Sequence, residues 1–178
     1  MRLVPKTTFK VKTKRNFKRD SKNSRLKILT SDALFLDKRV VLFAIPAAFS
    51  TTSSTDHLIG YEGQWDSFVT LGIDRVFCLS VNDPFVMDEW GKCLDIKYVQ
   101  LLPDGNGEFT RKMGMLVEKS NLNCGLRSWR YSMFAEDGVI KKVFVEDGFS
   151  DNSSNDPFEV TDADTMLNYL QNWREPFP

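Results

Sequence analysis

Residues 40–58 read VVLFAIPAAFSTTSSTDHL, and this stretch decides the fold. The run Val40–Ile45 is apolar without interruption, which indicates a strand buried on both faces of a sheet. Pro46 ends that strand, and a cluster of small hydroxyl residues follows it. This pattern predicts a strand-to-helix turn, where the first helical turn directs free backbone N–H groups and positive potential at one spot.

On either side of residues 40–58, strands and helices are expected to alternate. The predicted strands are residues 9–14, 27–29, 39–45, 75–80, 98–101, 130–135 and 139–146. The predicted helices are residues 33–36 (capped by Ser31-Asp32), 54–71, 84–92, 109–113 and 162–170 (capped by Thr161). The order predicts an α/β fold with a right-handed crossover from the 39–45 strand to the 75–80 strand.

Two glycines mark expected chain reversals. Gly72 is expected to end the helix 54–71, whose predicted buried face comprises Leu58, Tyr61, Trp65, Phe68 and Val69. Glu136-Asp137-Gly138 lies between two apolar runs and predicts a hairpin turn.

Composition indicates one globular domain over residues 1–178. Hydrophobic residues make up 42% of the chain, including 14 Phe and 4 Trp, which supports a packed core. No apolar run approaches the roughly 20 residues of a membrane span. Three cysteines without a CxxC pair fit a reducing compartment, so the cytoplasm is the expected location.

The net charge is zero, but it is unevenly distributed. Residues 2–27 hold eleven Lys or Arg and one acid, Asp20, which leaves 13 basic and 23 acidic residues in the remainder. A basic extension over residues 1–27 raises the alternative of nucleic-acid binding. The alternation in Thr8–Lys14 favours instead a solvated edge strand, on which lysines discourage pairing with other strands.

Five segments resemble motifs of the peroxiredoxins, which are thiol peroxidases. They are the loop Pro46–Ser53, with the pattern Pro-x-x-x-Thr/Ser-x-x-Cys, and Cys78–Val86, Leu101–Phe109, Arg127–Met133 and Asp156–Leu167. They occur in the family's order over residues 38–170 and look like a bacterial branch of the type II, or fifth, subfamily. The resemblance implies a thioredoxin-like fold, with a central mixed sheet flanked by helices and an N-terminal strand or hairpin extension.

The resemblance also implies roles for single residues. Ser53 stands at the position of the peroxidatic cysteine, Ser50 matches the hydroxyl that contacts peroxide, and Arg130 matches the active-site arginine. Pro46 would shield the site from water. No cofactor or metal is implied. From the residues alone, structural alternatives remain: Ser50 as a turn cap, Pro46 as a strand end, and Arg130 as the partner of an acid such as Glu146.

Ser53 is the departure from the family pattern. A serine hydroxyl stays protonated near neutral pH and cannot form a sulfenic acid, so the chain as written is expected to be inactive. Two explanations stand, an introduced Cys-to-Ser substitution or a natural inactive relative, and the intact surroundings favour the first. A Ser-His hydrolase using Ser53 or Ser54 with His57 lacks the Gly-x-Ser-x-Gly elbow, so His57 is interpreted as structural support.

The leading function is therefore that of a thiol-dependent peroxidase acting on hydrogen peroxide and alkyl hydroperoxides through position 53. The alternative is a non-enzymatic binding or sensor protein with the same fold. The implied reductant is glutathione with glutaredoxin, or thioredoxin. Cys78 is expected to be buried and inert, while Cys124 is the candidate reactive thiol and Ser153 the place of a replaced cysteine. A homodimer is expected, with a face near Phe49, Pro84-Phe85 and Tyr131.

Overall fold

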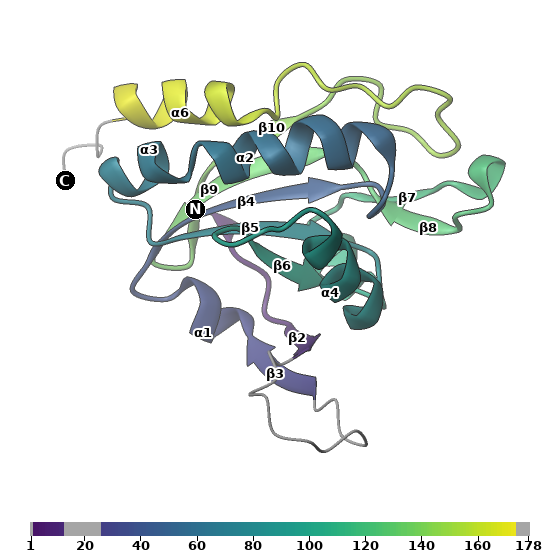
Figure 1. Ribbon diagram of the computed structural model, residues 1–178, viewed down its shortest axis with the longest axis horizontal. Coiled ribbons are helices and arrows are strands. Elements are labelled where there is room, and N and C mark those ends of the chain that lie inside the picture. Colours follow the sequence, from purple (N-terminus) through teal and green to yellow (C-terminus); the bar gives the residue numbers. More distant parts are fainter. Residues whose placement is uncertain (1, 13–25, 174–178) are drawn as a thin grey trace.

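The computed structural model describes residues 2–12 and 26–173, and its centre is a six-stranded mixed sheet (Figure 1). The strand order is β1-β10-β9-β4-β5-β6. β4, β5 and β6 are parallel, whereas β9 runs antiparallel to β4, and β10 and β1 continue the antiparallel part. The strand bounds are β1 (Arg2–Leu3), β4 (Arg39–Ile45), β5 (Arg75–Ser80), β6 (Gln100–Pro103), β9 (Tyr131–Glu136) and β10 (Val139–Val145).

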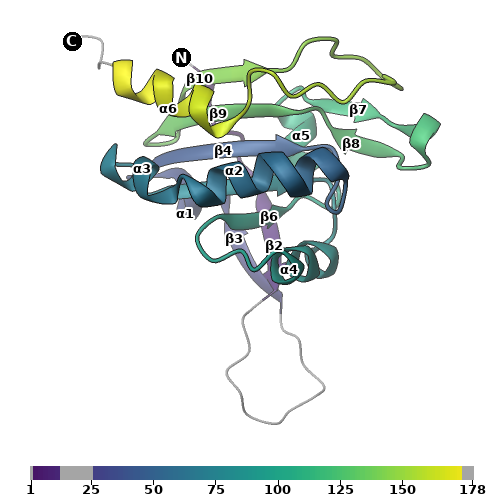
Figure 2. The same ribbon diagram turned by 45° about the horizontal axis from the view of Figure 1, so that its top comes forward.

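β4 lies at the centre and is buried on both faces. Val41, Phe43 and Ile45 face one core, and the alternate residues of the strand face the other. The first core is covered by α2 (Leu58–Gly63), α3 (Trp65–Thr70) and α6 (Ala163–Asn172). The second is covered by α1 (Ser31–Phe35), α5 (Glu108–Lys112) and the N-terminal hairpin. Figure 2 shows α2 and α6 together on one side of the sheet. The predicted α/β sandwich, with its thioredoxin-like mixed sheet, is confirmed.

Several predicted boundaries agree with the structure. β4 and β5 begin and end at the predicted residues, and the turn between β9 and β10 is where it was expected. Asp137 and Gly138 both have positive φ, of 46° and 71°, which is the two-residue turn that matches the twist of a hairpin. Gly72, with φ of 77°, follows α3 as predicted.

The predicted helix 54–71 is wrong in its continuity. It is divided into a wider π-helical segment η1 (Ser53–His57), then α2 and α3, with an interruption at Gln64. Val69 is 48% exposed, because the interruption turns it away from the core that Phe68 enters. Two predicted caps are also displaced by one residue: Thr30 caps α1 and Asp162 caps α6, through side-chain oxygens that accept from the helix N–H groups.

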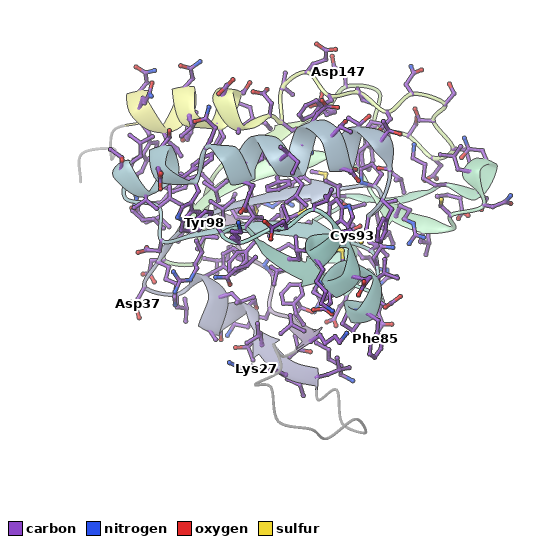
Figure 3. All side chains as sticks on the ribbon, viewed as in Figure 1. Lys27, Asp37, Phe85, Cys93, Tyr98 and Asp147 are labelled. Atoms are coloured by element: carbon purple, nitrogen blue, oxygen red, sulfur yellow. The ribbon has the colours of Figure 1, made fainter. Side chains whose placement is uncertain are left out.

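One small two-stranded sheet outside the main sheet was not predicted. β7 (Leu116–Glu118) and β8 (Leu126–Ser128) form a small hairpin, joined by η2 (Ser120–Leu122). Three residues are too few for an alternating pattern to be read from sequence. α4 (Pro84–Cys93) packs beside β6 at the other edge, with Asp83 as its cap, and Figure 3 shows Phe85 and Cys93 on it.

The N-terminal extension forms a hairpin of β2 (Thr8–Lys12) and β3 (Leu26–Thr30). Phe9 is buried against Phe109 of α5, with ring centroids 5.5 Å apart. Lys12 Nζ pairs with Asp88 of α4 at 2.7 Å. These contacts hold the described part of the extension to the globule, whereas the end of the predicted strand 9–14 and most of the basic residues lie outside the described residues.

Replacing Phe9 tests how firmly this hairpin is attached. Phe9→Ala removes a fully buried ring and should lower the free energy of unfolding by about 3 kcal/mol. Ile28→Ala, on the paired strand, is the matched control: Ile28 is 62% exposed, so the change should stay within about 0.5 kcal/mol. Urea denaturation measures both, and equal losses would show that the hairpin is not held by Phe9.

Candidate active site

The turn after β4 is fixed to the end of β5. The backbone N–H of Ala48 donates to Asn82 Oδ1 at 3.0 Å, and Ser80 Oγ donates to the same oxygen at 2.7 Å. Phe49 has φ of 64°, a left-handed conformation that costs a non-glycine residue on the order of 1 kcal/mol. The surrounding hydrogen bonds therefore hold a strained turn in one shape, and this turn begins at Pro46.

Ser53 and Ser50 are directly bonded in this turn. Ser53 opens η1 and is fully buried. Ser50 Oγ lies 2.8 Å from Ser53 Oγ and 3.0 Å from the carbonyl oxygen of Ala47. Because a hydroxyl has one hydrogen, Ser50 donates to one of these acceptors at a time. The neighbouring Ser54 points elsewhere: its Oγ accepts from Trp90 Nε1 at 3.0 Å.

Arg130 and His57 form a second buried pair. Arg130 Nη1 lies 3.0 Å from His57 Nδ1, and His57 Nε2 lies 3.0 Å from the carbonyl oxygen of Thr161. A guanidinium only donates and a carbonyl only accepts, so the proton of the neutral imidazole resides on Nε2. Burial, and next the charge of Arg130, hold the pKa of His57 well below its usual 6.5.

Arg130 reaches this position through the pairing of β9 with β4. Ala44 is opposite Tyr131, so Arg130 lies at the carboxyl end of β4, beside the turn. His57, which accepts from this guanidinium, is four residues after Ser53 in η1. Arg130 is 1% exposed, and its Nε has no hydrogen-bond partner among the described residues. Phe158 covers the guanidinium, whose carbon lies 5.6 Å from the ring centroid.

Arg130 pairs with Asp156 and not with Glu146, the acid suggested as its partner from the sequence. Arg130 Nη2 donates to Asp156 Oδ1 at 2.6 Å, whereas the Glu146 carboxylate accepts hydrogen bonds from residues 159–161. Sequence reasoning gave no role to Asp156, although the segment Asp156–Leu167 was one of the five motifs. Asp156 precedes Pro157, which restricts the backbone of Asp156 to an extended conformation. This restriction was the signal in the sequence for a carboxylate held in one position.

The hydrogen bonds of His57 agree with the rejection of a Ser-His hydrolase. Both nitrogens of His57 are engaged, one with Arg130 and one with Thr161, so His57 has no free acceptor for a serine hydroxyl. The interpretation of His57 as support of the site is consistent with these bonds. Tyr131 was expected at an exposed face, but it is buried in the sheet, because its side chain enters the core that α5 covers.

The three cysteines are free and separate. Burial raises the pKa of the Cys78 thiol well above its usual value, so Cys78 is inert as predicted. Cys93 is exposed at the end of α4, and Cys124 is partly exposed in the loop between β7 and β8. Ser153 lies against that hairpin, since its carbonyl oxygen accepts from Lys119 Nζ at 3.1 Å.

Two further features of the described part of the chain bear on function. Over residues 2–12 and 26–173, no group of three His, Cys, Asp or Glu is arranged to hold a metal ion. None of the helices within those ranges has the length and apolar character needed to cross a membrane.

Comparison with known proteins gives consistent results. The Redoxin family matches residues 9–167. A peroxiredoxin of Synechocystis sp. is 53% identical over 97% of this chain and 92% of its own, and one of Rhizobium etli is 45% identical over 94% of both chains. Among solved structures, a 1-Cys peroxiredoxin (antioxidant protein) of Plasmodium falciparum superposes with a TM-score of 0.88 at 30% identity, covering 96% and 98% of the two chains. Reduced Prx3 of Vibrio vulnificus in complex with H2O2 gives 0.82 at 34% identity, covering 95% and 96%.

The buried neutral imidazole predicts how stability depends on pH. His57 has a lowered pKa in the folded state and an ordinary one when unfolded, so below about 6.5 the unfolded chain binds more protons. The free energy of unfolding should therefore fall as the pH drops below about 6.5, by up to about 1.4 kcal/mol for each pH unit, and should show no contribution from His57 above it.

Urea denaturation between pH 5 and 8 measures this slope. His57 is the single histidine of the chain, so His57→Gln should remove the part of the slope near pH 6 and leave the carboxylate titration at lower pH. The same slope in both proteins would contradict the prediction.

Proposed function

The chain belongs to the peroxiredoxin family, and we propose that its site is built for peroxide reduction by a thiol at position 53, where this sequence has Ser53. We assign it to the type II subfamily on the five motifs of its sequence. The relatives bear the name peroxiredoxin, which supports a thiol-dependent peroxidase chemistry for the scaffold.

The observation that carries the proposal is the contact between Ser50 and Ser53 in the fixed turn after β4. A thiol in the place of Ser53 Oγ would lie within reach of the Ser50 hydroxyl, which also would contact a peroxide oxygen. Arg130 donates to His57, four residues after Ser53 in η1, and its Nε has no hydrogen-bond partner among the described residues. Such preorganised donors lower the pKa of a thiol and stabilise the charge that develops in the transition state.

Ser53 itself makes the chain as written inactive in this proposal. Attack on the O–O bond requires a thiolate, and the sulfur must then take up one oxygen as sulfenic acid. A serine hydroxyl stays neutral and has no such oxidation state. The scaffold without chemistry is the basis of the second candidate, a non-enzymatic peroxide-binding or sensor protein.

The reductant would come from outside the chain. Cys78 is buried, Cys93 lies at the end of α4 and Cys124 in the β7–β8 loop, and none of the three belongs to the turn that carries Ser53. Glutathione with glutaredoxin, or thioredoxin, would then reduce the sulfenic acid. One similar structure is described as a 1-Cys peroxiredoxin and another as a complex with H2O2, which supports a single-thiol mechanism with hydrogen peroxide as a substrate. Small alkyl hydroperoxides are added as substrates on the resemblance of the motifs alone.

Restoring the thiol tests the function. The chain as written should show no rapid peroxide turnover, while Ser53→Cys should consume hydrogen peroxide in stopped-flow measurements with a thiol reductant. Ser54→Cys is the matched control, because Ser54 is the next residue but bonds with Trp90. It should react no faster than free cysteine.

Replacing Arg130 tests whether peroxide reduction depends on the preorganised donors of the site or only on an accessible thiol at position 53. In the Ser53→Cys background, Arg130→Met should slow peroxide attack by about a hundredfold, the usual effect of removing one transition-state donor. A Ser53→Cys protein no faster than the Ser54→Cys control would sink the proposed function.

A homodimer and a reducing compartment complete the proposal. Phe49 and Phe85, at 54% and 51% exposure, lie on the turn after β4 and on α4 and offer an apolar face beside the site. Sedimentation should show a dimer at high micromolar concentration, and Phe85→Glu should shift it to monomer, whereas Tyr98→Glu, at a similarly exposed ring, should not. A wild-type monomer would contradict the dimer.

The free cysteines favour the cytoplasm.

A further inference from the structure

A buried carboxylate outside the motif loop is connected to Arg130 through three consecutive contacts. Glu146 follows β10 and is 2% exposed. We propose that Glu146 is a positioning residue, which holds the Arg130 guanidinium in place through Thr161 and His57. Its consequence for catalysis rests on the proposed function, but the geometric part concerns the chain as it stands.

The Glu146 carboxylate binds one short segment. It accepts from the backbone N–H groups of Glu159 at 3.0 Å and of Val160 and Thr161 at 2.9 Å, and from Thr161 Oγ1 at 2.8 Å. Within the described ranges, Glu146 has no ion-pair partner. A buried carboxylate is costly unless it is hydrogen-bonded, so these donors supply its compensation, and the acid and the segment fix each other.

Thr161 passes this constraint to His57. Its N–H and its hydroxyl are both held by Glu146, which fixes the backbone and the side-chain rotamer of the residue. The carbonyl oxygen of Thr161 then accepts from His57 Nε2 and from Tyr61 OH, each at 3.0 Å. The orientation of this carbonyl therefore sets which nitrogen of His57 is protonated, and leaves Nδ1 as the acceptor that faces Arg130.

The backbone of Glu146 closes the arrangement into a ring. Its N–H donates to the carbonyl oxygen of Arg130 at 3.2 Å, and its carbonyl oxygen accepts from Trp129 Nε1 at 2.8 Å. The main chain of Glu146 thus holds the base of Arg130, while its side chain holds the guanidinium through Thr161 and His57. Glu146 therefore acts on Arg130 at its main chain and, through Thr161 and His57, at Nη1 of the guanidinium, while Asp156 binds Nη2.

The test uses His57, the single histidine, as a spectroscopic probe. In the wild-type chain, long-range 1H–15N correlation spectra at pH 7.5 should show one set of His57 signals, of the Nε2–H tautomer. Glu146→Gln removes the charge, and Glu146→Asp withdraws the carboxylate by one methylene. Both should give a second set of signals or a mixture with the Nδ1–H tautomer.

Asp104→Asn is the matched control. Asp104 is also buried, and it also accepts from the N–H and the hydroxyl of one threonine, Thr110, as well as from Phe109 N–H. Asp104 lies in the loop between β6 and α5 and binds the first turn of α5, remote in sequence from Thr161. Asp104→Asn should lower the melting temperature to a similar extent and leave the His57 signals unchanged. Unchanged His57 signals in both Glu146 variants would overturn the proposal, as would the same change in Asp104→Asn.

The rate of peroxide reduction distinguishes a failure of the role of Glu146 from a failure of the proposed function. In the Ser53→Cys background, Glu146→Gln should slow peroxide reduction by about tenfold, the lower end of the effect of losing a supporting partner, and Asp104→Asn should not. If Ser53→Cys itself is inactive, the proposed function fails while the His57 signals still decide the role of Glu146. An active Ser53→Cys protein whose rate is unaffected by Glu146→Gln would remove Glu146 from the positioning residues.

Discussion

The pairing of β4 with β9 is the interaction on which the site depends. Side chains of β4 enter both hydrophobic cores, and the strand leads directly into the turn that carries Ser50 and Ser53. Because Ala44 is opposite Tyr131, the antiparallel register places Arg130 at the end of the strand where that turn begins. A register shift of one residue would direct the arginine to the opposite face of the sheet. The burial of the two strands therefore fixes the position of the charge as well as the core.

Much of this arrangement could be predicted from the sequence. The features that could not be predicted have physical causes. The apolar run Val40–Ile45 and the turn residues Asp137-Gly138 are local signals, and both agreed with the structure. Ser50 was identified from the spacing of the loop. Glu146 was named as a possible partner of Arg130, but its carboxylate binds Thr161, and Asp156 takes the place at Arg130. These bonds were missed because they are long-range contacts of loop residues, which follow no periodicity. The exposure of Val69 was missed for a related reason: the helix changes its winding at η1 and Gln64.

The charge balance of the site follows from burial. Arg130 is inside the protein with Asp156 as its ion-pair partner, and His57 stays neutral beside it because a second positive charge there would be repelled and desolvated. In the proposed function, a thiolate at position 53 would add a negative charge at the start of η1, the segment whose His57 accepts from Arg130, and the guanidinium would stabilise it. With Ser53 no such anion forms, and the ion pair with Asp156 remains.

The same contacts explain why the surroundings of Ser53 persist without a thiol. Ser50 also bonds to the Ala47 carbonyl, His57 also ties η1 to Thr161, and Arg130 also fixes the loop at Asp156. His57 and Arg130 are buried, so the loss of their bonds would leave a buried polar group unpaired, at a cost of about 1–3 kcal/mol. The hydrogen bonds around Ser53 are therefore accounted for by the stability of the fold, and they do not require a thiol at position 53.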